Sequence, residues 1–274
     1  MRGGRAVSSG RPGRAEPTSG GGRRDPGSHG GRRMRLDVAL TEAGLAESRT
    51  QAQALVMAGR VRIGGETVRE PGRLVPPRAH LEVVAPPRYV SRGGEKLAPA
   101  LDHFGVRVEG KVCADVGAST GGFTDVLLQR GAARVYAVDV GRALLHWRLR
   151  QDPRVVVMEG VNARYLTAFP EPVSLITVDV SFIGLEKVLP ALGRAAPGAD
   201  LVVLFKPQFQ VERGQVGKRG VVRDQVAVAA ALDRFRAWSA EHGFRLRGEL
   251  PSPLPGPEGN REILIWLHAP DPAP

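Results

Sequence analysis

Several residue types that mark particular classes of protein are scarce in this sequence. There is one cysteine, Cys113, so no disulfide can form within the chain and nothing points to an oxidising compartment. No apolar run approaches the ~18 residues that a membrane-spanning helix needs. Residues 1–33 also lack the apolar stretch of a secretion signal. We therefore expect a cytoplasmic protein with no membrane partner.

Lysine is also scarce, because nearly all of the 39 basic residues are arginine. Against 28 acidic residues they give a net charge of +11, which favours a polyanionic partner, nucleic acid before membrane. The length of 274 residues suggests one or two domains. Lys206 stands out because it ends the apolar run LVVLF, where an ammonium group is costly unless it is paired or used.

Residues 1–33 are rich in Gly, Arg, Ser and Pro and contain almost nothing to bury, which predicts a disordered tail. Eight arginines against Glu16 and Asp25 give this segment a net charge of +6, which leaves +5 for the remainder. The tail is either a basic arm for RNA or, in the interpretation that we prefer, a segment that adds little.

A small patterned module is predicted over residues 34–86. Apolar residues recur at helical spacing from Leu36, and Ser48 followed by Gln51 forms the capping box of a second helix, which Gly59 ends. The stretch RVRIGGETV alternates across a Gly-Gly turn and predicts a β-hairpin, and HLEVV adds a short strand.

The order of these elements resembles the S4 RNA-binding domain over about residues 34–85, and SRTQAQALVMAGRVRIGGETV is the matching stretch. The resemblance implies that Arg49, Arg60 and Arg62 contact RNA phosphates. Ordinary surface arginines are the alternative interpretation.

Pro86 and Pro87 mark a boundary, and we expect a linker over residues 87–93, an α/β domain over 94–268 and a C-terminal tail over 269–274. The predicted strands are KVCADVG, ARVYAVDV, RVVVMEG, VSLITVDV, LVVLFK and REILIWLH. The predicted helices are GGFTDVLLQRG, ALLHWRLRQ and DQVAVAAALDRFRAWSAEHG. This alternation predicts a Rossmann-like α/β fold with a mostly parallel sheet, whose sites lie at the carboxyl ends of the strands.

The stretch DVGASTGGFTD predicts a cofactor loop between the first strand and its helix, because its glycines allow a tight turn against a ligand. Asp139 ends the second strand, where a carboxylate can accept hydrogen bonds from both hydroxyls of an adenosine ribose. Ala118 and Ser119 stand where a dinucleotide loop needs glycine, so S-adenosylmethionine is favoured over a dinucleotide; a plain glycine-rich turn is the alternative. The expected cofactor residues are Asp115, Gly117, Ser119, Thr120, Gly121, Gly122, Phe123, Asp139, Asn162 and Asp179.

Four ionisable residues stand at positions where the fold itself has little need of them. Lys96 precedes the α/β core, Asp179 and Lys206 end apolar strands, and Glu262 opens the last strand. Each alone is well explained as an ion pair or a solvated strand end. Together, two amines and two carboxylates at one edge of a sheet predict a catalytic site.

The order Lys96, Asp179, Lys206 and Glu262 resembles the K-D-K-E tetrad of FtsJ-type 2′-O-ribose methyltransferases. The stretches RYVSRGGEKL, VDVSFI, KPQF, VGKRGVVRD and GNREILI extend the resemblance, from about residue 34 to 268, to the TlyA family. Members of that family are S4-plus-methyltransferase enzymes, often named hemolysins, that methylate ribosomal RNA. The resemblance implies S-adenosylmethionine as cofactor, a cytidine 2′-hydroxyl as acceptor and no metal. One departure is Gln210, where the family commonly has glutamate.

The chemistry suggests why a lysine stands at position 206. A ribose hydroxyl is a poor nucleophile until its proton is drawn away. Lysine can accept that proton if its pKa falls well below ~10.4, as burial and the neighbouring cation Lys96 would favour, whereas arginine stays protonated. We therefore predict Lys206 as the base, or as the group that orients the hydroxyl. Asp179 would hold Lys206, while Lys96 and Glu262 would position the ribose and the second amine.

The glycine-rich basic stretch 210–224 is predicted to be an RNA lid, with a flexible connector as the alternative. Two other functions stay open: a non-catalytic RNA-binding factor for ribosome assembly, and a membrane-active hemolysin. Ribosomal RNA or ribosomal subunits are the expected partners, and both a monomer and a homodimer are compatible with the sequence. The linker and the lid add four expected RNA contacts, Arg88, Arg92, Lys218 and Arg219.

Overall fold

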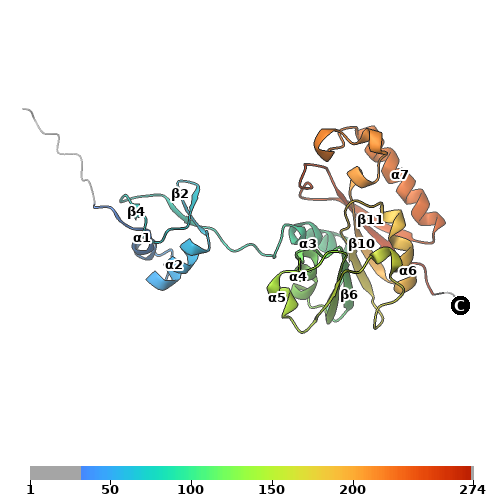
Figure 1. Cartoon of the computed structure of the whole chain (residues 1–274), viewed down its shortest axis with the longest axis horizontal. Coiled ribbons are helices and arrows are strands. Elements are labelled where there is room, and N and C mark those ends of the chain that lie inside the picture. The colour runs from blue at the N-terminus through green and yellow to red at the C-terminus, as the bar shows by residue number, and fades with distance from the viewer. Residues whose placement is uncertain (1–31, 273–274) are drawn as a thin grey trace, which may run out of the picture. The chain divides into compact units, whose positions relative to one another are not determined.

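The structure is a computed structural model that describes residues 32–272, so nearly all of the tail predicted over residues 1–33 lies outside the described residues. The chain divides between Pro86 and Pro87 into two compact units (Figure 1). Each unit has its own hydrophobic core, and the two are described separately.

The N-terminal unit packs two short helices against short antiparallel strands. Strand β2 pairs with both β3 and β5, and β1 pairs with β4. Leu36, Leu40 and Val56 are fully buried between these elements. In order, the elements are β1 (Met34–Arg35), α1 (Leu36–Glu42), α2 (Arg49–Met57), β2 (Val61–Ile63), β3 (Glu66–Val68), β4 (Leu74–Val75) and β5 (Leu81–Val83).

Local sequence signals account for most of this unit. The Ser48 hydroxyl accepts a hydrogen bond from the Gln51 amide at 3.2 Å and caps α2 as predicted, whereas the Gln51 side chain accepts from the Glu47 amide rather than that of Ser48. The hairpin turn has φ of +57° at Gly64 and +89° at Gly65, the left-handed conformation that a two-residue turn of this kind requires.

The C-terminal unit is built on a seven-stranded sheet in the order β11-β12-β10-β9-β6-β7-β8. The strands from β10 to β8 run parallel, and β12 runs antiparallel to both of its neighbours, which confirms the predicted α/β class. The strands are β6 (Val112–Val116), β7 (Arg134–Asp139), β8 (Val155–Glu159), β9 (Leu175–Val178), β10 (Asp200–Phe205), β11 (Arg245–Pro251) and β12 (Ile263–His268).

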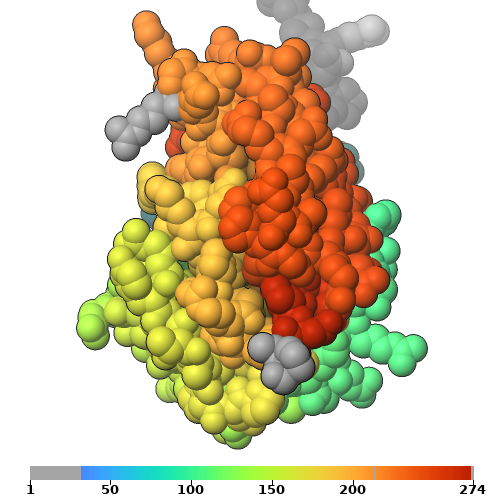
Figure 2. All heavy atoms as spheres, turned by 90° about the vertical axis from the view of Figure 1, so that its right-hand side faces the viewer, coloured from blue at the N-terminus to red at the C-terminus, as the bar shows by residue number. Residues whose placement is uncertain are grey.

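Helices cover both faces of this sheet, with one buried cluster on each face (Figure 1). Figure 2 looks onto the side of the unit where α7 lies, drawn in orange. The helices on one face are α3 (Gly93–Phe104), α4 (Gly122–Gln129) and α5 (Trp147–Arg150), and those on the other are α6 (Leu189–Ala195) and α7 (Gln225–Glu241). Short 3-10 turns lie between the elements, namely η1 (Ala163–Tyr165), η2 (Leu185–Lys187), η3 (Pro207–Phe209), η4 (Arg213–Gln215) and η5 (Lys218–Gly220).

Several elements differ from the prediction. The predicted helix ALLHWRLRQ is a single turn, α5, because Ala143 has φ of +58° and the His146 amide is bonded to Thr120 O at 3.2 Å in the cofactor loop. Helices α3 and α6 and strand β11 were not predicted. Helix α3 is hidden in the sequence by two glycines at its start and by the internal Pro99.

The chain changes direction across the sheet between β6 and β9. It runs outward from β6 through β7 to β8, then returns to place β9 on the other side of β6. The Asp179 amide donates to Val116 O at 2.8 Å and joins the carboxyl ends of these two strands. Ligands of open α/β sheets bind at such a switch point. Among residues 32–272, no helix is both long and apolar enough to cross a membrane.

Candidate active site

The cofactor loop after β6 follows a path that glycine alone permits at two positions. Gly117 has φ of +84°, and a Cβ there would lie 2.4 Å from Asp179 O. Gly121 has φ of +95°, and its Cβ would lie 2.2 Å from the Leu149 side chain. Both positions have left-handed backbone and a close neighbour. At Gly117 that neighbour is backbone, so a larger residue would displace the loop from the sheet edge, whereas at Gly121 a leucine side chain would have to shift.

Asp139 at the end of β7 organises this loop. Its carboxylate accepts hydrogen bonds from the amide of Ser119 at 2.8 Å and from that of Gly141 at 2.7 Å. Ser119 itself has φ of +49°, and the bond holds it there. Asp139 is half-buried and faces a cavity of about 800 Å³ whose wall also includes Val140 and Asn162.

Asp115 forms part of the floor of the site. Its carboxylate is fully buried, accepts from the amide and hydroxyl of Thr124 at 2.8 and 2.7 Å, and accepts from the Thr177 hydroxyl at 3.2 Å. Burial, and next the charge of Asp179, raise the pKa of Asp115 to about 7. The residue thus ties the start of α4 to the sheet.

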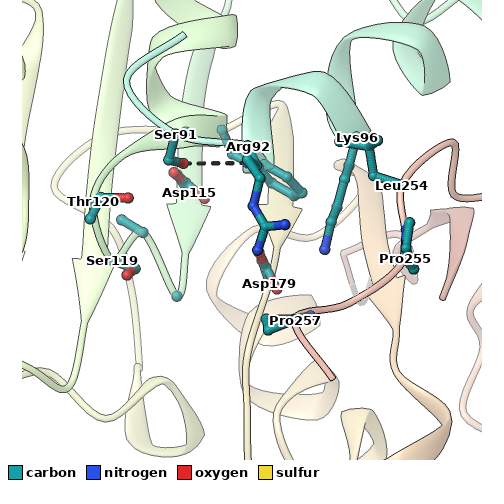
Figure 3. Close-up of a pocket in the computed structure, with 15 residues that line it drawn as sticks. Ser91, Arg92, Lys96, Asp115, Ser119, Thr120, Asp179, Leu254, Pro255 and Pro257 are labelled. Atoms are coloured by element: carbon teal, nitrogen blue, oxygen red, sulfur yellow. Dashed lines mark hydrogen bonds between the residues drawn. The ribbon is translucent and has the colours of Figure 1, made fainter. Parts of the chain in front are cut away.

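A second cavity of about 210 Å³ adjoins the first, and Gly117, Ser119 and Asp179 line both. Figure 3 shows Arg92 and Lys96 extending into it between the cofactor loop and the segment that carries Leu254, Pro255 and Pro257. Three carboxylates line the two adjoining cavities, those of Asp115, Asp139 and Asp179.

The four ionisable residues singled out in the sequence form two amine–carboxylate pairs. Lys206 Nζ lies 2.6 Å from Asp179 Oδ1, and Lys96 Nζ lies 2.5 Å from Glu262 Oε2. Lys96 and Asp179 both line the smaller cavity, so the pairs share one site. Lys96 lies on α3, Asp179 and Lys206 directly follow β9 and β10, and Glu262 directly precedes β12.

The pairing changes one part of the sequence argument. Lys96 was expected both to act as a cation that lowers the pKa of Lys206 and, with Glu262, to position the ribose and the second amine; the structure pairs Lys96 directly with the buried carboxylate of Glu262. The second oxygen of Glu262, Oε1, is buried and has no hydrogen-bond partner within residues 32–272.

Two residues at this site were not singled out in the sequence. The Ser181 hydroxyl accepts a hydrogen bond from Lys206 Nζ at 2.9 Å. Phe182 lines the larger cavity with φ of +65° and a side chain that is 91% exposed, and its ring centroid lies 5.2 Å from that of Phe209. A phenylalanine four residues past the end of β9, in the segment that begins with Asp179, was the available signal.

The other expected cofactor residues lie around the cavities. Thr120, Gly122 and Phe123 line the smaller cavity. Asn162 lines the larger one, but its Oδ1 also accepts from the Arg164 amide at 3.2 Å and caps η1. Gly121 lines neither and instead lies beneath Leu149.

The expected RNA-contact residues fall in different surroundings. Arg92 lines the smaller cavity, although the sequence grouped it with the RNA contacts. In the same unit, the Arg88 guanidinium lies 5.3 Å from the ring centroid of Tyr89, and Lys218 and Arg219 are exposed on η5.

In the N-terminal unit, Arg49 is held 3.3 Å from the buried Asp37, and Arg35 pairs with the same carboxylate at 3.0 Å. Arg60 Nε donates to Val84 O at 3.0 Å, and Arg62 is exposed on β2. Arg35 and Asp37 were not singled out in the sequence. The Arg35 side chain hydrogen-bonds to Asp37, which holds the pKa of Asp37 well below its usual range.

This fold and this site match known protein families. The family model of FtsJ-like methyltransferases matches residues 89–269, and the model of the S4 domain matches residues 34–80. The chain belongs to the FtsJ-like methyltransferase family, with an S4 domain ahead of the catalytic region, as the tetrad and the helix–hairpin pattern predicted.

Individual relatives show which members of this family the chain is similar to. The 16S/23S rRNA (cytidine-2′-O)-methyltransferase TlyA of Mycobacterium tuberculosis is 50% identical over 240 residues, 86% of this chain and 90% of that protein. Hemolysin A of Brachyspira hyodysenteriae is 41% identical over 235 residues, 84% of this chain and 98% of that protein. Among solved structures, a candidate hemolysin from Streptococcus thermophilus is 44% identical, with a TM-score of 0.67 over 87% of this chain and 89% of that chain.

Proposed function

We propose that this enzyme transfers a methyl group from S-adenosylmethionine to a cytidine ribose 2′-hydroxyl of ribosomal RNA. The observation that carries the proposal is the pair of lysine–carboxylate contacts, Lys206–Asp179 and Lys96–Glu262, beside the glycine loop at the switch point of the sheet. The relative named as a 16S/23S rRNA (cytidine-2′-O)-methyltransferase, at 50% identity, supports the same substrate class.

The residues present fit this cofactor. Asp115, Asp139 and Asp179 line the two cavities, and carboxylates suit a sulfonium and an ammonium group better than a pyrophosphate. Asp139 would accept hydrogen bonds from the adenosine ribose, Val140 and Asn162 would lie along the adenine, and the Gly117 loop and Asp179 would hold the methionine end. When bound, S-adenosylmethionine supplies an electrophilic methyl group that an in-line displacement passes to the acceptor oxygen.

The chain's own residues would align and activate the acceptor. Alignment of the two reacting atoms supplies much of the rate in such a displacement. Lys206, held by Asp179 and Ser181, is placed to orient the 2′-hydroxyl and to take its proton. Lys96, held by Glu262, would fix the ribose on the other side.

The test is transfer of labelled methyl from S-adenosylmethionine to ribosomal subunits that lack the modification. We expect label on 2′-O-methylcytidine with the wild type and none with Lys206→Ala, while S-adenosylmethionine affinity stays near the wild-type value. Lys111→Ala is the matched control, because Lys111 pairs with Asp200 at 3.7 Å ahead of β6, at the opposite edge of the sheet. Measurable cofactor binding without transfer to either subunit or to free RNA would instead favour an assembly factor. A red-cell lysis assay of the same preparations tests the activity that the hemolysin-named relatives suggest.

A further inference from the structure

A third cavity, of about 310 Å³, lies at the surface next to the proposed active site. Its wall includes Pro207, which directly follows Lys206, together with Arg223, Gln225 and Arg261. Arg223 precedes α7, and Arg261 directly precedes the tetrad residue Glu262. Two residues of the cavity wall, Pro207 and Arg261, are therefore sequence neighbours of tetrad residues.

One buried side chain, Asn260, brings the two arginines together. Its Oδ1 accepts from the Val222 amide at 2.9 Å, and its Nδ2 donates to Gly220 O at 2.8 Å. Only 2% of Asn260 is exposed. Arg223 directly follows Val222, and Arg261 directly follows Asn260. The hydrogen bond between Val222 and Asn260 therefore places both arginines on the wall of one cavity.

Both guanidinium groups are available to a ligand. Arg223 and Arg261 are exposed, and within residues 32–272 all ion pairs of arginine involve other residues. The carboxylate of the intervening Asp224 is turned to the start of α7, where it accepts from the amides of Val226 and Ala227 at 2.9 and 3.1 Å. Two guanidinium groups that form no ion pair within the described part of the chain, both beside one cavity, suit a phosphodiester, because its oxygens accept charge-assisted hydrogen bonds from guanidinium N–H groups.

We propose that Arg223 and Arg261 form a binding site for an RNA backbone phosphate next to the target nucleotide, with Asn260 as the positioning residue that builds the site. This inference rests on the proposed function for the identity of the RNA. It differs from the expected lid contacts, Lys218 and Arg219, which lie on η5 and do not line this cavity. A phosphate held here, one residue from Lys206 along the chain, would limit how far the target ribose can move from the lysine.

The test compares Arg223→Gln/Arg261→Gln with the wild type in binding to unmodified ribosomal subunits at several salt concentrations, without S-adenosylmethionine. We expect affinity to fall roughly tenfold or more, as for the removal of a charge-assisted hydrogen bond. The plot of log affinity against log salt should become shallower by about 0.7 for each RNA phosphate that the variant no longer neutralises. Arg107→Gln/Arg247→Gln removes the same charge from exposed arginines away from this cavity and should leave both quantities near wild type.

Arg223→Lys/Arg261→Lys keeps the charge and should retain the wild-type salt dependence. In steady-state methyl transfer, the glutamine pair should raise KM for the subunit and leave S-adenosylmethionine affinity unchanged. Unaltered affinity and salt dependence in the glutamine pair would overturn the phosphate site even if the wild type methylates RNA. A wild type that binds subunits and transfers no methyl would overturn the proposed reaction, while the binding comparison would still decide the phosphate site.

Discussion

At the residue scale, a substitution of Lys206 can show whether this lysine acts as a base or only as a positioning group. Lys206→Arg keeps a positive charge beside Asp179 and Ser181, but a guanidinium cannot accept the hydroxyl proton. If lysine acts as the base, we expect kcat to fall by about 10²–10⁴ with little change in S-adenosylmethionine affinity. Single-turnover methyl transfer and cofactor titration measure the two quantities. A Lys206→Arg enzyme with near-normal kcat would assign to Lys206 the orienting role alone.

The raised pKa of Asp115 predicts that the stability of the folded chain depends on pH. Its pKa is about 7 in the folded chain against an ordinary 3.8, so between these values the folded chain keeps a proton that the unfolded chain has released. The unfolding free energy should therefore decrease as pH rises from about 4 to 7 and level off above, a contribution of up to about 4 kcal/mol. Denaturant unfolding of wild type and Asp115→Asn across this range measures the difference.

The comparison for that experiment is Asp102→Asn. The hydrogen bond from Arg130 lowers the pKa of Asp102, so the contribution of this carboxylate to the unfolding free energy decreases as pH falls. This pH dependence is opposite in sign to that of Asp115. A wild-type and an Asp115→Asn curve that stay parallel from pH 4 to 7 would show that Asp115 ionises normally in the folded protein.

At the scale of elements, the Gly117 turn after β6 should be intolerant of a side chain. Gly117→Ala adds left-handed strain of about 1–2 kcal/mol and a Cβ 2.4 Å from Asp179 O, so both stability and S-adenosylmethionine affinity should decrease. Gly110→Ala is a matched control, because Gly110 has φ of +70° but nothing within 4 Å of its Cβ position. Equal losses of stability in the two variants, with cofactor affinity intact, would contradict a special role for the Gly117 turn.

The two loops that Asn260 joins should loosen together when that side chain is removed. Asn260→Ala leaves the Val222 amide and Gly220 O without partners, which should cost about 1–3 kcal/mol of unfolding free energy. Asn260→Asp keeps an acceptor for Val222 but places an oxygen against Gly220 O, so it should also lose stability. Hydrogen exchange of residues 217–222 is the measurement: faster exchange in both variants than in the wild type is expected, and unchanged protection in both would show that Asn260 does not hold the two loops together.

The elements that sequence predicted well carry local signals. The Ser48 cap, the Gly64–Gly65 turn and the β-strands that end at Asp139 and Phe205 follow from patterns within a few residues. The elements that escaped prediction are set by distant contacts. The segment before α5 is held by the bond from the His146 amide to Thr120 O, and the pairing of Lys96 with Glu262 needs two segments far apart in the chain.

At the scale of the whole molecule, the two units should be separable. Within residues 32–272, the two buried clusters around the large sheet begin at Tyr89, and the cluster of the small unit ends by Val83. A chain that begins at Pro87 should fold cooperatively and bind S-adenosylmethionine, but its KM for ribosomal subunits should rise by at least an order of magnitude because the S4 arginines are absent. Calorimetry, cofactor titration and methyl transfer test these outcomes. A truncated chain with normal KM would show that the S4 domain does not contribute to substrate binding.

The position of β12 has a consequence for when the enzyme becomes competent during its synthesis. Lys96 and Glu262 are 166 positions apart, and β12, which Glu262 precedes, inserts between β10 and β11 as the last strand of the sheet in sequence. Contacts of such long sequence separation close late in folding. A nascent chain should therefore lack one of its two lysine–carboxylate pairs until residue 268 is free to fold, and we expect the proposed methyl transfer only after the whole sheet has formed.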